Sequence, residues 1–203
     1  MEDLNVSWRQ LCERIGLANA ESLGAELVSR YSERHRIYHG IEHLRQVLAV
    51  LDELGSEPLL ALAAWFHDAV LEPGRHDNEA KSALLARNSL PALGLPAVQV
   101  EFVSRAVLAT ASHEASGSDF DMLLDADLSI LAASPEAYDA YRRGIRREYS
   151  FLGDPEFKAG RGAFLRTMLA RPAIFRSTQG RQAFDAAARR NIGDELHRIE
   201  TQP

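Results

Sequence analysis

The sequence predicts an all-α fold, and three observations support this expectation. Apolar residues recur at helical spacing along nearly the whole chain. No stretch alternates steadily between apolar and polar residues, and no Asn-Gly or Asp-Gly pair marks a hairpin. Proline and glycine mark several of the expected helix ends, as at Gly55, Pro58 and Pro73-Gly74. We therefore expect a single-domain bundle of about nine helices over residues 1–203.

The first helices are predicted by apolar stripes. One stripe begins the chain at Leu4, Trp8, Leu11 and Ile15, and a second covers 41–54 and ends at Gly55. The third helix, over 59–71, is apolar on every side, which is typical of a buried helix. We expect it to start at Pro58 and to be closed by Pro73-Gly74.

Six further helices complete the prediction. Asn78 is a candidate N-cap for a helix over 78–90. Ser134 followed by Pro135 is a strong helix start, because serine caps the helix and proline fits its first position. The remaining ranges are 98–111, 121–133, 135–150, 154–170 and 178–200.

Length and composition limit the class of protein. The chain has 203 residues, of which 46% are hydrophobic and 26% charged, enough for one sizeable core. The single cysteine excludes an intrachain disulfide and suits a reducing compartment. The start is acidic, unlike a targeting signal, and no apolar run approaches the roughly 20 residues that span a bilayer. We expect a cytoplasmic protein that does not bind membranes.

Charge is unevenly distributed along the chain. The net charge of -6 argues against a protein that wraps nucleic acid. Residues 1–134 carry 10 basic and 20 acidic side chains, whereas residues 135–203 carry 13 and 9, and all but one of those 13 are arginine. These arginines either cover a solvated helical surface or include some that face an anionic substrate, because guanidinium matches phosphate geometry.

The pair His67-Asp68 is the most informative feature of the sequence. It ends the apolar run Leu59–Phe66, and on a helix its one-turn neighbours would also be apolar. Ionisable groups in such surroundings are costly unless they are paired or bound to a metal. The pair therefore indicates that a further group occupies this place.

Four side chains could converge on a metal in a helical bundle. His43 lies at the edge of the stripe over 41–54, His67 and Asp68 end the buried helix, and Asp127 lies in the apolar segment 122–128. Two imidazoles and two carboxylates suit Mn, Fe, Co, Ni, Zn or Mg. Taken singly, a histidine beside an apolar stripe is more often a core residue than a ligand.

Asp125 competes with Asp127 for this role. Residues two apart on a helix face different ways. The one-turn neighbours of Asp127 are all apolar, whereas those of Asp125 include Asp121 and Ser129. We therefore expect Asp127 to face inward as the ligand, and Asp125 to support the site or to lie at the surface.

The order of these residues resembles the HD superfamily of metal-dependent phosphohydrolases, in particular a subgroup of predicted hydrolases without an implied substrate. The resemblance covers roughly residues 35–180 and is carried by short local matches. These are 38–43 (YHGIEH), 66–70 (FHDAV), Asn78-Glu79 with Ser82-Ala83, 124–128 (LDADL), Tyr138, Tyr141, Ile145-Arg146, Glu148-Tyr149 and Gly160-Arg161.

The resemblance implies an HD-type helical domain, one divalent metal, and cleavage of a phosphoester by a metal-activated water. The substrate would be a small phosphorylated metabolite, with nucleotides among the candidates. Asp68 would take part in catalysis as well as in metal binding. Glu72, one turn beyond Asp68 if the helix continues, and His113 are candidates for proton transfer, and each could instead be a surface residue.

Substrate contacts are less well defined. Arg142 and Arg146, one turn apart, could clamp a phosphate, and Arg75 and Arg161 lie beside glycines from which they could reach over a cleft. His39 could contact the substrate or support the metal site. A solvated surface position is the alternative for each arginine.

Two other functions stay open. A di-iron oxygenase of HD type would need extra histidines for a second metal. His113, before a predicted turn at Ser116–Ser118, is the first candidate, and His39 or His76 would be less well placed. A non-catalytic module that senses a metabolite would not need the full ligand set.

The stripe Leu4 to Ile15 could cap the core or contact another subunit in a homo-oligomer.

Overall fold

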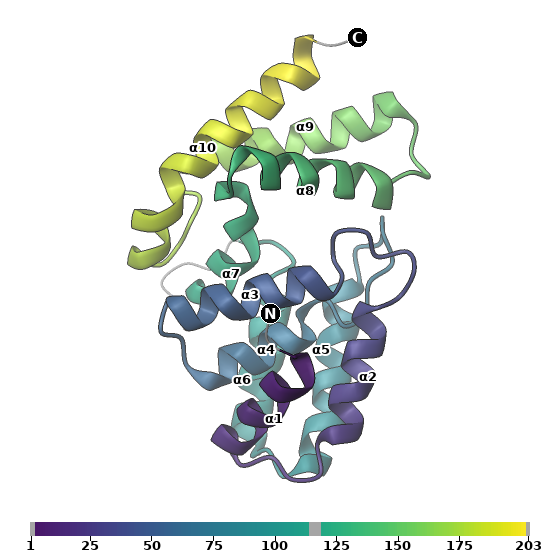
Figure 1. Cartoon of the computed structure of the whole chain (residues 1–203), viewed down its shortest axis with the longest axis vertical. Coiled ribbons are helices and arrows are strands. Elements are labelled where there is room, and N and C mark those ends of the chain that lie inside the picture. The colour runs from purple at the N-terminus through teal and green to yellow at the C-terminus, as the bar shows by residue number, and fades with distance from the viewer. Residues whose placement is uncertain (1–2, 114–118, 202–203) are drawn as a thin grey trace.

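The computed structural model describes residues 3–113 and 119–201, and every regular element in these ranges is helical. Figure 1 shows them as a lower group of helices, α1 to α6, and an upper group, α8 to α10, with α7 between the two. The elements are α1 Leu4–Ile15, α2 Glu21–Tyr31, α3 Ile41–Glu53, α4 Pro58–His67, α5 Asn78–Ser89, η1 Leu90–Leu93, α6 Ala97–Ala109, α7 Asp121–Leu128, η2 Ser129–Ala132, α8 Pro135–Glu148, α9 Asp154–Ala170 and α10 Thr178–Thr201.

The lower group packs around α4. The segment 62–67 of this helix is buried on all sides, as the apolar run predicted, and α1, α3, α5, α6 and α7 all contact α4. Trp65 packs edge-to-face against Trp8 of α1, with ring centroids 5.0 Å apart. The stripe that begins the chain therefore covers this core.

A second core lies in the upper group. It joins buried residues of η2, α8, α9 and α10, among them Leu131, Ile145, Leu165 and Ile192. At its centre Arg161 of α9 forms a two-point ion pair with Glu195 of α10, with N–O distances of 2.9 and 3.0 Å. This arrangement satisfies a charge that would be costly to bury alone.

Three details of the predicted helices were wrong. The helix α2 was missed, because its glycine and serines weaken the helical signal. Gly24 is needed there because a Cβ atom would overlap the Trp8 indole. The predicted helix over 121–133 changes to a 3₁₀ turn at Ser129, whose hydroxyl donates to the Ala126 carbonyl at 2.7 Å.

The third correction concerns α4, which ends at His67 and not at residue 71. Side chains take over the backbone groups that follow. Arg36 donates to the carbonyls of Asp68 and Ala69, and the Ser82 hydroxyl accepts from the Val70 N–H at 3.0 Å. Asn78 bonds both backbone groups of Glu72 and does not cap α5.

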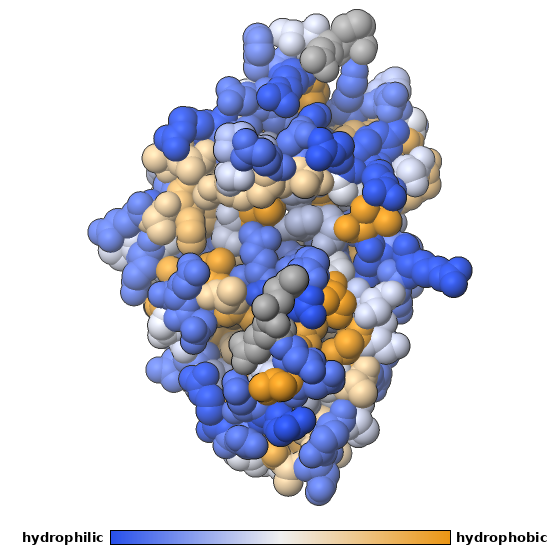
Figure 2. Space-filling model, in the orientation of Figure 1, coloured by the Kyte–Doolittle hydropathy of each residue, from blue (hydrophilic) through white to orange (hydrophobic). Residues whose placement is uncertain are grey.

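Further expectations concerned the start of α8, a turn near residue 117 and membrane-spanning helices. The predicted start of α8 is confirmed, since the Ser134 hydroxyl accepts from the Ala137 N–H and Pro135 occupies the first helical position. The turn predicted at Ser116–Ser118 lies outside the described residues. Among the helices described, none is long and apolar enough to cross a membrane. The face in Figure 2 is mostly hydrophilic, with apolar residues at mid-height where the two groups of helices meet.

Candidate metal centre

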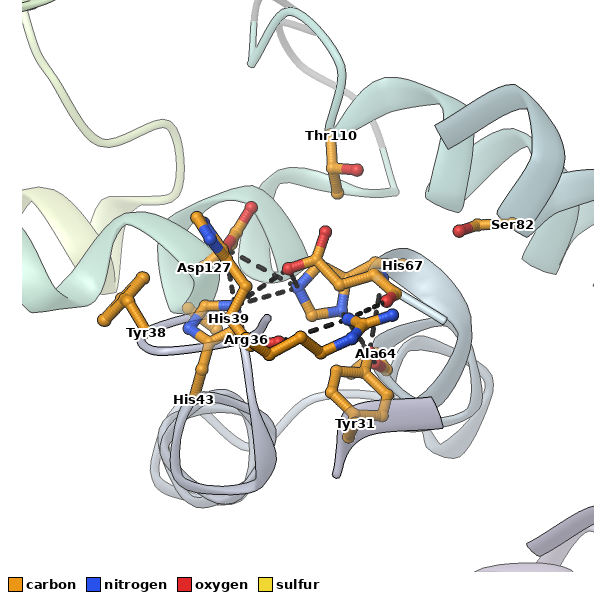
Figure 3. A network of polar contacts seen from close by, with 12 residues as sticks. Tyr31, Arg36, Tyr38, His39, His43, Ala64, His67, Ser82, Thr110 and Asp127 are labelled. Carbon is orange, nitrogen blue, oxygen red and sulfur yellow. Dashed lines mark hydrogen bonds and ion pairs between the residues drawn. The ribbon is translucent and has the colours of Figure 1, made fainter. Parts of the chain in front are cut away.

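Three helices bring four predicted ligands to one place. His43 lies in the first turn of α3, His67 is the last residue of α4 with Asp68 directly after it, and Asp127 lies in the last turn of α7. Figure 3 shows His43, His67 and Asp127 approaching one another from these separate helices. The shortened α4 matters here, because Asp68 leaves the helix and both members of the His-Asp pair can face the same point.

The donor atoms are spaced as ligands of one ion would be. The Nε2 atoms of His43 and His67 are 3.0 Å apart, and each is 3.4–3.5 Å from an Asp68 oxygen. An Asp127 oxygen lies 3.2 Å from His43 and 3.7 Å from His67. Metal–ligand bonds of about 2.0–2.2 Å place neighbouring donors about 3.0 Å apart at right angles and about 3.4 Å apart in a tetrahedron. His43, His67 and Asp68 therefore form a group that could hold a divalent ion, and Asp127 lies beside both histidines.

His67 is oriented by its other ring nitrogen. Nδ1 lies 2.7 Å from the Ala64 carbonyl, so it donates there and leaves Nε2 free to bind a metal. The Tyr31 hydroxyl bonds the same carbonyl and accepts from the Asp68 N–H, both at 3.2 Å. His43 has no such support, because its buried Nδ1 contacts no hydrogen-bond partner among the described residues.

The cluster attracts positive charge. Burial disfavours the charged form of His67, but the carboxylates of Asp68 and Asp127 outweigh burial and raise the pKa of His67 to about 9. Burial lowers the pKa of the neighbouring His43. Burial also opposes the Asp127 carboxylate, yet hydrogen bonds from His113, His43 and His67 hold the pKa of Asp127 well below its usual range.

Arg36 was missed by the sequence interpretation. Its side chain is fully buried, and it donates to the carbonyls of His39, Asp68 and Ala69 at 2.6–3.2 Å. It thereby ties the segment before α3 to the segment after α4. Nothing in the local sequence distinguishes it from a surface arginine, since its partners lie up to 33 residues away.

Glu148 is the second important residue that was not assigned a role. One carboxylate oxygen accepts from the N–H groups of Ile37, Tyr38 and His39 at 2.6–2.8 Å, and the other accepts from His39 Nδ1 at 2.7 Å. Burial opposes the charged forms of both residues, but their mutual contact lowers the pKa of Glu148 and raises the pKa of His39. The pair fixes the loop that leads into α3.

A sequence signal for Glu148 did exist. Tyr138, Tyr141 and Ile145 form the buried stripe of α8, and Glu148 continues this stripe at helical spacing. A carboxylate on an apolar stripe must find a partner inside the protein. That reasoning identifies a buried acid, although it does not identify His39 as its partner.

His113 contacts the candidate centre from outside. Its Nε2 lies 2.8 Å from the Asp127 oxygen Oδ2, while Oδ1 of the same carboxylate faces His43 and His67. The backbone of His113 is left-handed, with φ 52°, which is uncommon for a residue other than glycine. Arg176 donates to the His113 carbonyl at 3.1 Å and helps to hold this conformation.

The argument that separated Asp125 from Asp127 was only partly correct. Asp127 does reach the candidate centre, but Asp125 is no surface residue, since it is fully buried. α7 contacts α3, α4 and α10, and Gly180 of α10 packs against Asp125. Asp125 accepts from the N–H groups of Arg176 and Ser177 and from the Ser177 hydroxyl, at 2.5–2.8 Å, and so holds the start of α10.

Glu72 was wrongly placed near Asp68. Because α4 ends at His67, residue 72 is no longer one turn beyond Asp68. Its side chain is 59% exposed and lies 3.6 Å from Arg75 and 3.7 Å from Lys81. Glu72 is therefore a surface carboxylate and a poor candidate for proton transfer.

The predicted arginine contacts are also corrected. Arg142 and Arg146 form no clamp, since Arg142 pairs with Asp139, and Arg146 pairs with Asp154 and donates to the carbonyls of residues 149 and 152. Arg75 pairs with Asp77 at the surface. Of the four arginines proposed, Arg161 is the one beside the candidate centre, and Glu195 occupies its guanidinium.

A cavity of about 490 Å³ lies between η2, α8 and α9, and Asp127 is the one proposed ligand that lines it. His39 and His113 also line it, so a small molecule in the cavity could reach Asp127 and both of these histidines. Its volume lies in the range of about 300–1,000 Å³ that is usual for small-molecule sites.

Comparisons with known proteins do not extend this picture. A scan against protein-family models, a search of curated proteins and a search of solved structures each found no significant match to this chain.

Proposed function

We propose that this protein is a metal-dependent phosphohydrolase that cleaves a phosphoester of a small metabolite. The observation that carries the proposal is the convergence of His43, His67, Asp68 and Asp127. The Nε2 atom of each histidine lies 3.0–3.7 Å from the other histidine and from an oxygen of each carboxylate. Phosphoester chemistry is the reaction implied by the HD resemblance, and the adjoining cavity supplies room for a substrate.

Each residue has a distinct task in this proposal. His43, His67, Asp68 and Asp127 would hold the ion, which when bound polarises a phosphoryl oxygen and makes a water a stronger nucleophile. His39 lines the cavity, and Glu148 holds its Nδ1, so the charged imidazole can donate from Nε2 to the ester oxygen that leaves. His113 holds the second oxygen of Asp127 and fixes the orientation of that carboxylate.

Elemental analysis of protein purified without chelator tests the first part. We expect one divalent ion per chain in the wild type and none in Asp68→Ala, whereas Asp52→Ala, which removes an exposed carboxylate on α3, should retain it. The metal-loaded protein should hydrolyse a phosphomonoester, and Asp68→Ala should not. A wild-type protein that takes up no manganese, cobalt, iron or zinc would refute the proposal.

One observation favours a second candidate, the di-iron oxygenase. The two oxygens of Asp127 face different histidines, as a carboxylate between two metal positions would, with His113 on the outer side. This alternative predicts two irons per chain, loss of one of them in His113→Ala, and turnover that requires oxygen. One ion per chain and hydrolysis under argon would exclude it.

A further inference from the structure

The chemistry of the cavity wall indicates which substrates the proposed hydrolase would accept. Beyond its inner end the wall is formed mainly by apolar and aromatic side chains. These include Ile130 and Leu131 of η2, Tyr149 and Leu152 of the turn after α8, and Phe157 and Phe164 of α9. A group that fills this space therefore leaves water for an apolar surface, which favours apolar groups over polar ones.

The wall offers little to a chain of phosphates. Arg161 is the one arginine among the described residues that line the cavity, and no lysine is found among them. Both sides of the Arg161 guanidinium are occupied, by the two oxygens of Glu195 and by the Tyr141 hydroxyl at 2.9 Å. A second anion would have to compete with a buried ion pair that is already complete.

The other charged residues of the wall lead to the same conclusion. His39 is paired with Glu148, and His113 is paired with Asp127, whereas His76 lies on an exposed part of the wall, where solvent screens its charge. Glu156, at the N-terminal end of α9, adds a negative charge to the wall. An additional phosphate among the apolar side chains would thus lose its water without gaining an unpaired buried cation, which is a large cost.

We propose that the cavity binds an uncharged apolar or aromatic group, so that the substrate is a monoester of an apolar alcohol and not a nucleoside polyphosphate. This inference rests on the proposed function for the position of the ester bond, at the end lined by His39 and Asp127. The preference itself comes from the wall and applies to any ligand that enters the cavity.

Gly160 of α9 offers a way to change the cavity with little risk to the fold. It lines the cavity, and a Cβ atom at this position would meet no other atom within 4 Å. Gly160→Leu should narrow the cavity, and Gly160→Lys should add a cation that has no internal partner. Gly193→Leu is the matched control, because Gly193 lies in α10, away from the cavity, and has the same open space.

The experiment measures kcat/KM of the manganese-loaded protein for 1-naphthyl phosphate, glycerol 2-phosphate and adenosine triphosphate. We expect 1-naphthyl phosphate to exceed both others by more than about tenfold, since each methylene-sized apolar group removed from water changes binding roughly fourfold. Gly160→Leu should lower this preference, Gly160→Lys should shift it toward the triphosphate, and Gly193→Leu should keep it. Circular dichroism confirms folding of each variant.

Binding of 1-naphthol, followed by its fluorescence, separates the two proposals. Hydrolysis of glycerol phosphate or the triphosphate as efficient as that of the naphthyl ester would overturn the inference and leave the hydrolase intact. Naphthol binding that is weakened by Gly160→Leu, without hydrolysis of any ester, would support the apolar cavity and overturn the hydrolase. Hydrolysis and naphthol binding both absent would overturn both.

Discussion

Replacing Glu148 tests whether one buried carboxylate organises the loop before α3. In Glu148→Ala, the N–H groups of Ile37, Tyr38 and His39 and the Nδ1 atom of His39 lose their acceptor. In Glu148→Gln, one amide oxygen can still accept from the three N–H groups. The amide nitrogen would then face His39, and the charged contact is lost.

The structure sets the size of these effects. The Glu148 side chain is fully buried, so solvent screens its contacts little, although the loop residues themselves are partly exposed and can regain some hydration. With about 1–3 kcal/mol for each unsatisfied group, reduced by that hydration, Glu148→Ala should lower the free energy of unfolding by about 3 kcal/mol. For a chain of this length that corresponds to a fall in Tm of roughly 6–12 °C. Glu148→Gln should cost about half as much.

Urea denaturation followed by circular dichroism measures both variants. Glu200→Gln is the control, because Glu200 forms an exposed ion pair with Arg166 and should change stability by less than about 0.5 kcal/mol. Equal losses in Glu148→Ala and Glu148→Gln would mean that the three backbone hydrogen bonds contribute nothing, and the reasoning would fail. So would a loss in Glu148→Ala as small as that of the control.

The Glu148–His39 pair also predicts the pH range over which its contribution to stability is greatest. The folded-state pKa of Glu148 lies below its usual value of 4.5, so its contribution is complete above about pH 4.5 and is lost as pH falls through the lowered value. The folded-state pKa of His39 lies above 6.5, so its contribution is complete below about pH 6.5 and is lost as pH rises through the raised value. The stability difference between wild type and Glu148→Gln should therefore be largest between about pH 4.5 and 6.5. A difference that is constant from pH 3 to 9 would contradict this assignment.

Three further predictions concern the other charged residues. Asp68→Ala should lower metal affinity by more than the roughly 10–100-fold cost of losing a supporting residue, whereas Asp125→Asn should retain the metal and lose about 2 kcal/mol of stability. Elemental analysis measures the first effect and urea denaturation the second, and loss of the metal in Asp125→Asn but not in Asp68→Ala would contradict the assignment. Arg142→Ala should leave KM for a phosphoester unchanged, because Arg142 is paired with Asp139. A several-fold rise in KM would mean that Arg142 contacts the substrate after all. Glu195→Ala should cost about 3–5 kcal/mol by leaving Arg161 buried without its partner, and a thermal shift no larger than that of Glu200→Gln would contradict this.

The helices could be predicted largely from the sequence because each is determined by its own apolar stripe and its own caps. The all-α class and the start of α8 at Ser134-Pro135 follow from such local signals. The end of α4 does not, because the apolar pattern continues through Val70 and Leu71. Arg36, Ser82 and Asn78 end this helix from elsewhere in the chain by bonding the backbone after His67. A local pattern cannot report contacts of this kind.

The candidate site divides in the same way. The four proposed ligands could be selected because each is an ionisable residue in an apolar context. The structure groups His43, His67 and Asp68 and places Asp127 beside both histidines. Which of Asp125 and Asp127 points toward the candidate centre was harder to predict. The facing argument assumed that α7 buries only one face, so that just one of Asp125 and Asp127 would point inward. Because α7 contacts α3, α4 and α10, burial alone could not identify which aspartate reaches the candidate centre.

The arginines show why a charge count is a poor guide to a binding site. The excess of arginine in residues 135–203 suggested an anionic substrate, yet Arg142, Arg146 and Arg161 each bond a carboxylate of this chain. Arg161 and Glu195 both lie on the buried stripes of their helices, and a charge on such a stripe needs a buried partner of opposite sign. A charged residue on the buried stripe of a helix can therefore be predicted to be buried. An excess of arginine in one part of the sequence identifies neither the partner of each arginine nor a bound ligand. For the cavity, the relevant quantity is the charge left after these internal pairs have formed. Among the described residues this leaves a mainly apolar wall that includes Asp127, next to a group of side chains that could hold a metal.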